Sequence, residues 1–185
     1  LKINAFDQPN VQESKDNTKK VIAEYAANKR LPVAETIPGE AAGSALKALL
    51  DKLKSGRSYF ALMSYTAKNA TSERSLLRIR TAVRDAYRVA TTSGYGPRFL
   101  HSTGQLHKGG PPLGVFLQIV EEDGTDVSIP GQPNGFSTLK QAQAIGDLES
   151  LKSRRLPVLR VTLGSNHNKG WAALVAAVEG ATSKH

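Results

Sequence analysis

Apolar segments that alternate with longer amphipathic segments constrain the fold of this chain most strongly. We expect β-strands at the short apolar runs 58–65, 113–120 and 156–163. We expect helices where apolar residues recur every three or four positions, at 41–53, 72–90, 138–152 and 169–178. Strands separated by such helices need crossover connections, which favour parallel pairing and helices on both faces. The sequence therefore predicts an α/β fold of three layers, with a mostly parallel sheet of about 3–5 strands.

The N-terminal region is expected to form a helical arm that precedes this sheet. Pro9 suits a first helical turn, where its missing N–H has no intrahelical partner. Apolar residues at helical spacing follow it: Val11, Val21, Ile22 and Tyr25. The segment 31–38 contains two prolines, which predicts an extended linker and a domain boundary. We therefore expect a helical arm at 1–30, an α/β domain at 38–182 and a frayed tail at 181–185.

Composition removes several classes of function. The chain of 185 residues has no cysteine, which excludes disulfides, thiolate nucleophiles and thiolate metal sites. The formal net charge is +9, but the Lys and Arg residues are spread out and not interleaved with aromatics, so we expect no nucleic-acid partner. No apolar run reaches the ~18 residues of a membrane span, and the N-terminus lacks a secretory signal. We expect a cytoplasmic protein without membrane partners and, since it begins at Leu1, a piece of a longer chain.

Two segments carry side chains suited to ligand binding or proton transfer. Lys15 lies about two turns into the expected first helix, where its ammonium group could neutralise a sugar oxygen or a phosphate; a solvated surface lysine is the alternative. Segment 99–112 contains three glycines, expected to let backbone N–H groups approach an anion, and a dense polar set: His101, Ser102, Thr103, Gln105, His107 and Lys108. Histidine suits proton transfer near neutral pH, whereas an ordinary solvent loop is the alternative. No third ligand lies near His101 and His107, so we expect no metal site.

Two further patterns have simpler explanations. Segment 64–72 joins an expected strand to an expected helix and is rich in hydroxyl groups, which either hold a phosphate or cap the helix. We favour capping. Ser44 and Lys47 match the S-x-x-K pattern of serine β-lactamases, but the partner motifs are missing and the pair falls within an amphipathic helix. We treat that match as chance.

The segment NAFDQPNVQESK (4–15) resembles the C-terminal signature of the phosphoglucose isomerase family. In that signature an Asp-Gln pair precedes a helix, and an active-site lysine follows seven residues after the glutamine. Gln8 and Lys15 keep this spacing. The resemblance implies that Lys15 reaches the sugar ring oxygens and that Gln8 helps to line the pocket.

A second segment, LHSTGQLHKGG (100–110), resembles another element of the same family, with His, Ser, Gly and Gln at matching positions. In the family this histidine assists opening of the sugar ring and comes from the neighbouring subunit, so the resemblance implies that role for His101 and a homo-oligomer. Ser102, Thr103 and Gln105 become candidate substrate-binding residues. The stretches GYGPRFLHSTGQLHKGGP and TLKQAQAIGDLESL together look most like the end of bifunctional transaldolase/phosphoglucose isomerase fusions.

Two departures from the family pattern bear on function. The histidine element ordinarily precedes the Gln/Lys element, whereas here it follows by about 90 residues. The family's catalytic glutamate lies in a Gly-Glu-Ser-type segment that this chain does not contain. The carboxylates present are mainly on helices or in the turn 121–124, and a base must come within hydrogen-bond reach of the substrate.

The leading hypothesis is the C-terminal portion of a glucose-6-phosphate isomerase that needs no metal or organic cofactor. Its expected partners are a sugar phosphate and upstream transaldolase and isomerase domains of the same polypeptide. We expect the isolated chain to be inactive, because the glutamate base is missing. One alternative is that the domain from Pro38 onward is a non-catalytic docking or oligomerisation module. A weaker alternative is a basic nucleic-acid binder, whose signature would be salt-dependent binding.

Overall fold

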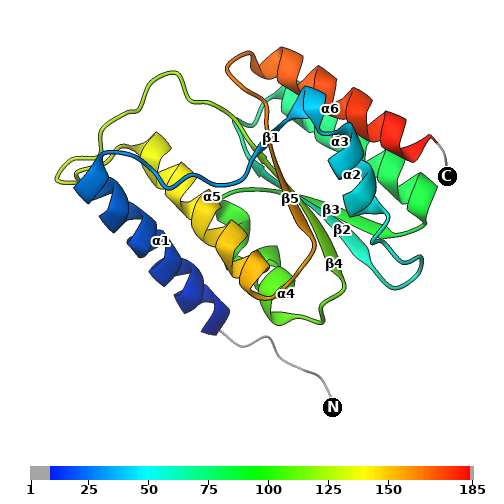
Figure 1. Cartoon of the computed structure of the whole chain (residues 1–185), viewed down its shortest axis with the longest axis horizontal. Helices are drawn as coiled ribbons and strands as arrows, with labels where there is room; N and C mark the ends of the chain where they lie inside the picture. Colours follow the sequence, from blue (N-terminus) through cyan, green and yellow to red (C-terminus); the bar gives the residue numbers. More distant parts are fainter. Residues whose placement is uncertain (1–8, 184–185) are drawn as a thin grey trace.

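The computed structural model describes residues 9–183 and shows an α/β fold with helices on both faces of an all-parallel, five-stranded sheet (Figure 1). The strands lie in the order β1-β5-β4-β2-β3. Their bounds are β1 (Ile37–Pro38), β2 (Tyr59–Tyr65), β3 (Ala90–Tyr95), β4 (Gly114–Val120) and β5 (Val158–Thr162). The helices are α1 (Pro9–Asn28), α2 (Gly43–Leu50), α3 (Ala70–Tyr87), α4 (Thr103–Gly109), α5 (Phe136–Ser153) and α6 (His167–Thr182). Short 3₁₀ turns are η1 (Gly39–Ala41) and η2 (Arg98–His101). The predicted fold class is confirmed.

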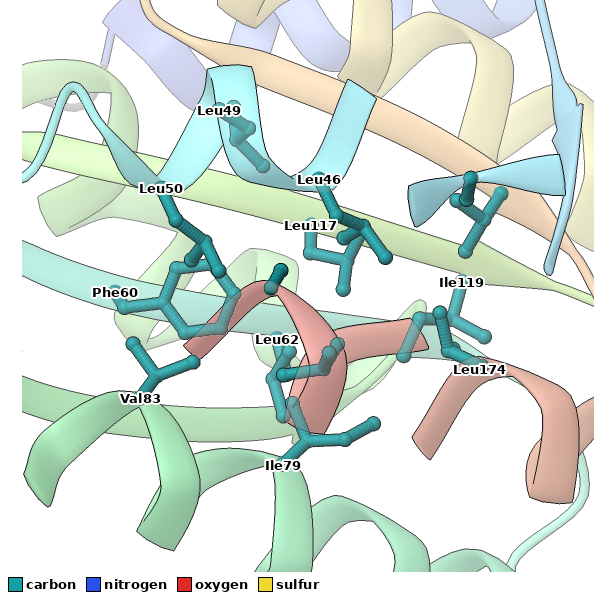
Figure 2. Close-up of a cluster of buried hydrophobic side chains, with 14 of the residues drawn as sticks. Leu46, Leu49, Leu50, Phe60, Leu62, Ile79, Val83, Leu117, Ile119 and Leu174 are labelled. Atoms are coloured by element: carbon teal, nitrogen blue, oxygen red, sulfur yellow. The ribbon is translucent and has the colours of Figure 1, made fainter. Parts of the chain in front are cut away.

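One face of the sheet is covered by α2, α3 and α6. Alternate strand residues such as Phe60 and Leu62 point to this face and are fully buried there. Figure 2 shows side chains from the three helices meeting these strand residues in one cluster. Most members of this cluster are aliphatic side chains, and their burial stabilises the fold.

The other face is covered by α4 and α5, and α1 lies against α5 (Figure 1). Ala61 and Met63, which alternate with the residues of the first face, are buried on this side with Phe116. Helix α5 is therefore enclosed between the sheet and α1. A Cβ atom on Gly146 would lie 3.0 Å from the backbone nitrogen of Thr18, so the two helices approach closely where this glycine stands.

Several predicted elements differ from the structure. Segment 90–95 was expected to end a helix and begin a loop, but it forms strand β3 at the sheet edge. Segment 99–112, expected to be a loop, contains η2 and α4. The expected linker 31–38 ends in β1, which pairs with β5. A frayed tail was expected at 181–185, but helix α6 continues to Thr182 and Ala181 is buried, so that expectation is wrong for these two residues.

Side chains accept hydrogen bonds from the free backbone N–H groups at the start of α3 and of α5. The Asn69 side chain accepts hydrogen bonds from the backbone nitrogens of Thr71 and Ser72, so the capping role expected for segment 64–72 is confirmed. Ser137 directly precedes the helix expected at 138–152, but it lies inside α5 and does not cap it. Its backbone N–H donates to Asp126 at 2.7 Å, so a carboxylate from the preceding loop satisfies this helix end. No helix within residues 9–183 is long and apolar enough to cross a membrane.

Candidate functional site

A pocket of about 260 Å³ contains both residues that were predicted to be catalytic. It lies between the N-terminal half of α1, the end of η2 and the second turn of α5. The described residues that line it are Ser14, Lys15, Thr18, Lys19, Leu100, His101 and Gln143. Lys15 and His101 are about 90 residues apart in the sequence, yet they line the same pocket.

Each side of the pocket follows from local structure. Ser14 and Thr18 are one helical turn apart, so they lie on the same face of α1, and the Thr18 hydroxyl donates to the Ser14 carbonyl at 2.9 Å. Lys15 and Lys19 follow one position later and are exposed. His101 ends the 3₁₀ turn that follows β3, and its side chain is also exposed.

The lining suits an anionic ligand that carries hydroxyl groups. Lys15 and Lys19 supply ammonium groups, and Gln143 supplies an amide with both donors and an acceptor. The described lining contains no carboxylate, so nothing in it would repel a phosphate. His101 is the group in this lining that suits proton transfer near neutral pH.

The other predicted binding residues are not in the described lining of this pocket. Ser102 and Thr103 are exposed and begin α4. The Ser102 hydroxyl donates to the Phe99 carbonyl at 3.3 Å, and the Gln105 amide donates to the His101 carbonyl at 3.5 Å, so both side chains contact the local backbone. Gln8 lies outside the described residues.

A buried polar network lies beneath the pocket and was not predicted. The Lys108 ammonium donates to Asp147 at 2.5 Å and to the Ser14 hydroxyl at 2.9 Å. The Tyr65 hydroxyl donates to the other carboxylate oxygen of Asp147 at 3.4 Å. The side chains of Lys108 and Asp147 are each 2% exposed. Burial raises the pKa of the Asp147 carboxyl, and the Lys108 ammonium opposes that rise.

One sequence feature of α5 is consistent with this network. Helix α5 has Gly146, Asp147 and Ser150 between its apolar residues, and all three are buried. Buried positions that extend around a helix beyond one apolar stripe indicate that a second element covers it. That partner is α1, where the Asn17 amide donates to the Ser150 hydroxyl at 3.1 Å.

His107 differs from His101 in its surroundings. It was expected in a polar loop, with either a binding role or ordinary solvent exposure, but its ring is buried and stacked on Tyr59, with centroids 5.6 Å apart. Burial, and to a smaller degree the Lys108 ammonium, lowers the pKa of His107 to about 4. It is therefore neutral at ordinary pH and belongs to the core. Within residues 9–183, no group of three or more His, Asp or Glu side chains is arranged to hold a metal ion.

A second hollow, of about 640 Å³, lies at the carboxyl ends of β4 and β5, where α/β folds commonly bind ligands. Its lining includes four carboxylates: Glu121, Glu122, Asp123 and Asp126. The buried Glu121 accepts from the Ala67 backbone N–H at 2.7 Å, and the His167 ring lies 3.5 Å from its other oxygen. A lining this acidic disfavours a phosphate, so we take the pocket with Lys15 and His101 as the candidate site.

Comparisons with known proteins extend the description of the fold. No protein-family model matches the sequence, and no curated protein matches it significantly. The structure is similar to the crystal structure of a hypothetical protein, TT0462, from Thermus thermophilus, with a TM-score of 0.55 and 17% identity over 93% of this chain. The chain spans 44% of the length of that protein. At this identity the similarity supports the α/β fold alone.

Proposed function

We propose that this chain is the C-terminal portion of a glucose-6-phosphate isomerase, from a protein that also carries a transaldolase. The observation that supports this most is the shared pocket of Lys15 and His101. The two residues belong to separate motifs, and each motif resembles an active-site element of the same enzyme family. The fold brings the two residues into one pocket although they are about 90 positions apart in the sequence.

In this proposal each residue has a distinct role. His101 moves a proton between the ring oxygen and the C1 hydroxyl of the sugar, which opens the ring. Lys15 stabilises negative charge on sugar oxygens, and Lys19 is close enough to help attract the phosphorylated substrate. Proton transfer between C1 and C2 needs a carboxylate base, and the described lining contains none. That base is therefore expected from another part of a longer, cytoplasmic polypeptide or from a second subunit of a homo-oligomer.

Substitutions in the full-length enzyme test these roles. Lys15→Ala or His101→Ala should lower isomerase turnover at least ~100-fold, as loss of an acid–base or charge-stabilising group does. Lys20→Ala is the matched control, because Lys20 is an exposed lysine of α1 outside the described pocket lining. Unchanged turnover in either variant removes that residue from the mechanism. Robust turnover by the isolated 185-residue chain contradicts the proposal that it is only a portion of the enzyme.

A second candidate function is a docking or oligomerisation module appended to an isomerase. Two observations favour it: the reversed order of the motifs, and the absence of Ser102, Thr103 and Gln105 from the described pocket lining. A truncation of the full-length protein after Leu31 separates the two candidates. Full isomerase activity in the truncated protein supports the docking module, whereas loss of activity with an intact fold upstream supports the catalytic role.

A further inference from the structure

The helix that carries Lys15 is held to the body in two different ways along its length. In the second half of α1, the apolar side chains of Val21 and Ile22 pack with Ala142 and Ile145 of α5. In the first half, α5 approaches the α1 backbone closely at Thr18, and three polar contacts also join this half of α1 to the body. They are the bond from Lys108 to Ser14, the bond from Asn17 to Ser150 and the ion pair of Glu13 with Arg154. The polar half is the half that lines the pocket.

We infer that Lys108 and Asp147 are positioning residues that fix the first half of α1, and with it Lys15, against the pocket. Lys108 stands on α4, Asp147 on α5 and Ser14 on α1, so this network joins three elements at one point. Ser14 directly precedes Lys15, so fixing the Ser14 side chain restricts where the Lys15 backbone can lie. The inference rests on the proposed function only for its catalytic consequence.

Lys108 and Asp147 restrict the position of α1 more than they strengthen its attachment to the body. Apolar contacts like those of Val21 allow a helix to slide or rotate slightly at little cost, because they have no preferred direction. A buried ammonium group must keep its carboxylate and hydroxyl partners, since an unpaired buried charge is very costly. The network therefore accepts one position of Ser14. Among the described residues, every buried side-chain nitrogen and oxygen has a hydrogen-bond partner, so the network is complete.

The buried ion pair of Lys108 with Asp147 also differs from the outer ion pair of Glu13 with Arg154, which joins α1 to the residue that follows α5. Glu13 and Arg154 have side chains that are 34% and 27% exposed, so water can replace either partner. The hydrogen bond and charge of Arg154 lower the pKa of Glu13, although burial opposes this. Lys108 and Asp147 have no such access to water. The inner pair therefore sets the position, and the outer pair adds to it.

The double variant Lys108→Met/Asp147→Asn tests the inference. It removes both charges, leaves an unbranched side chain one atom shorter at position 108 and an amide oxygen for the Tyr65 hydroxyl, so the fold should persist. Amide hydrogen exchange in 12–19 should become at least ~10-fold faster, while exchange in 20–28 and in α6 stays within ~2-fold. The matched control is Arg78→Met/Glu179→Gln, which removes an exposed ion pair between α3 and α6. Unchanged exchange in 12–19 overturns the inference.

Two further measurements separate positioning from general loss of structure. If the double variant does not fold, Ser14→Ala removes only the bond that reaches α1, and it should still speed exchange in 12–19 by ~3-fold or more. In the full-length enzyme, Lys108→Met/Asp147→Asn should lower turnover ~10-fold or more. In the Lys15→Ala background the same double substitution should lower turnover by less than ~2-fold, because it acts on turnover through Lys15. Additive losses overturn the positioning role. Loss of exchange protection without any effect of Lys15→Ala on turnover refutes the proposed function and leaves the positioning of α1 standing.

Discussion

The ring of His107 is stacked on Tyr59 and lies edge-on to Phe116, with centroids 5.6 and 5.1 Å away. Burial, with a smaller contribution from the Lys108 ammonium, lowers the pKa of His107 to about 4. In the unfolded chain the imidazole titrates near its ordinary value of 6.5. Between these two values the unfolded state binds more protons than the folded state. The stability contributed by neutral His107 is therefore complete above ~6.5 and is lost as the pH falls toward about 4.

The size of this effect follows from the two pKa values. Each unit of difference corresponds to ~1.4 kcal/mol, so protonation of His107 alone should cost about 3 kcal/mol in all. About 2 kcal/mol of this should be lost between roughly pH 7 and pH 5. His107→Gln removes the titration and keeps a side chain that can pair with the Tyr59 hydroxyl, which lies 3.1 Å from the imidazole Nδ1.

Urea unfolding followed by far-UV circular dichroism at several pH values measures the effect. The wild-type protein and His107→Gln share every other titrating group, so the difference between their pH profiles isolates His107. The free energies of unfolding should converge by about 2 kcal/mol between roughly pH 7 and pH 5. Parallel profiles for His107→Gln and wild type would refute the argument from burial.

Two matched pairs of substitutions test the packing on each side of the sheet. Gly146→Leu should destabilise the protein by ~1–3 kcal/mol in urea unfolding, because the new Cβ atom would lie 3.0 Å from the Thr18 backbone. Gly180→Leu is the control: a Cβ atom there meets nothing within 4 Å, so the better helix propensity of leucine should raise stability by ~0.5 kcal/mol. Equal effects of the two glycine substitutions would contradict the close packing of α1 on α5. Leu174→Ala, at a fully buried site in α6, should cost ~2–5 kcal/mol, whereas Leu77→Ala, 61% exposed, should cost less than ~0.5 kcal/mol. A loss below ~1 kcal/mol for Leu174→Ala would show that the core cluster tolerates the cavity.

Elements with a strong apolar pattern could be predicted from the sequence, and elements without one could not. The strand at 113–120 was expected because a central strand needs apolar residues on both faces, and β4 is buried throughout. Strand β3 has the sequence ATTSGY, which carries little apolar signal. It lies at the sheet edge, where half-buried polar residues are tolerated, and its pairing with β2 decides its conformation.

Segment 99–112 shows how polar composition misled the prediction. Three glycines and six polar residues are typical of a loop, yet much of the segment forms η2 and α4. His107 and Lys108 are buried because α4 packs them against Phe116 and Asp147. Local composition cannot reveal such burial, because the partners come from β4 and α5.

The sequence alone determined the α/β class, the existence of an N-terminal helix and two candidate residues, Lys15 and His101. These depend on apolar periodicity and on short motifs, which are local properties of a chain. The tertiary structure decided which of the candidates share a pocket and which contact only their own backbone. It also revealed the ion pair of Lys108 with Asp147, whose partners are 39 residues apart. A buried ion pair forms only when the fold brings both charged groups into close contact, because that contact must offset their loss of water, and local sequence patterns do not show which distant residues will meet.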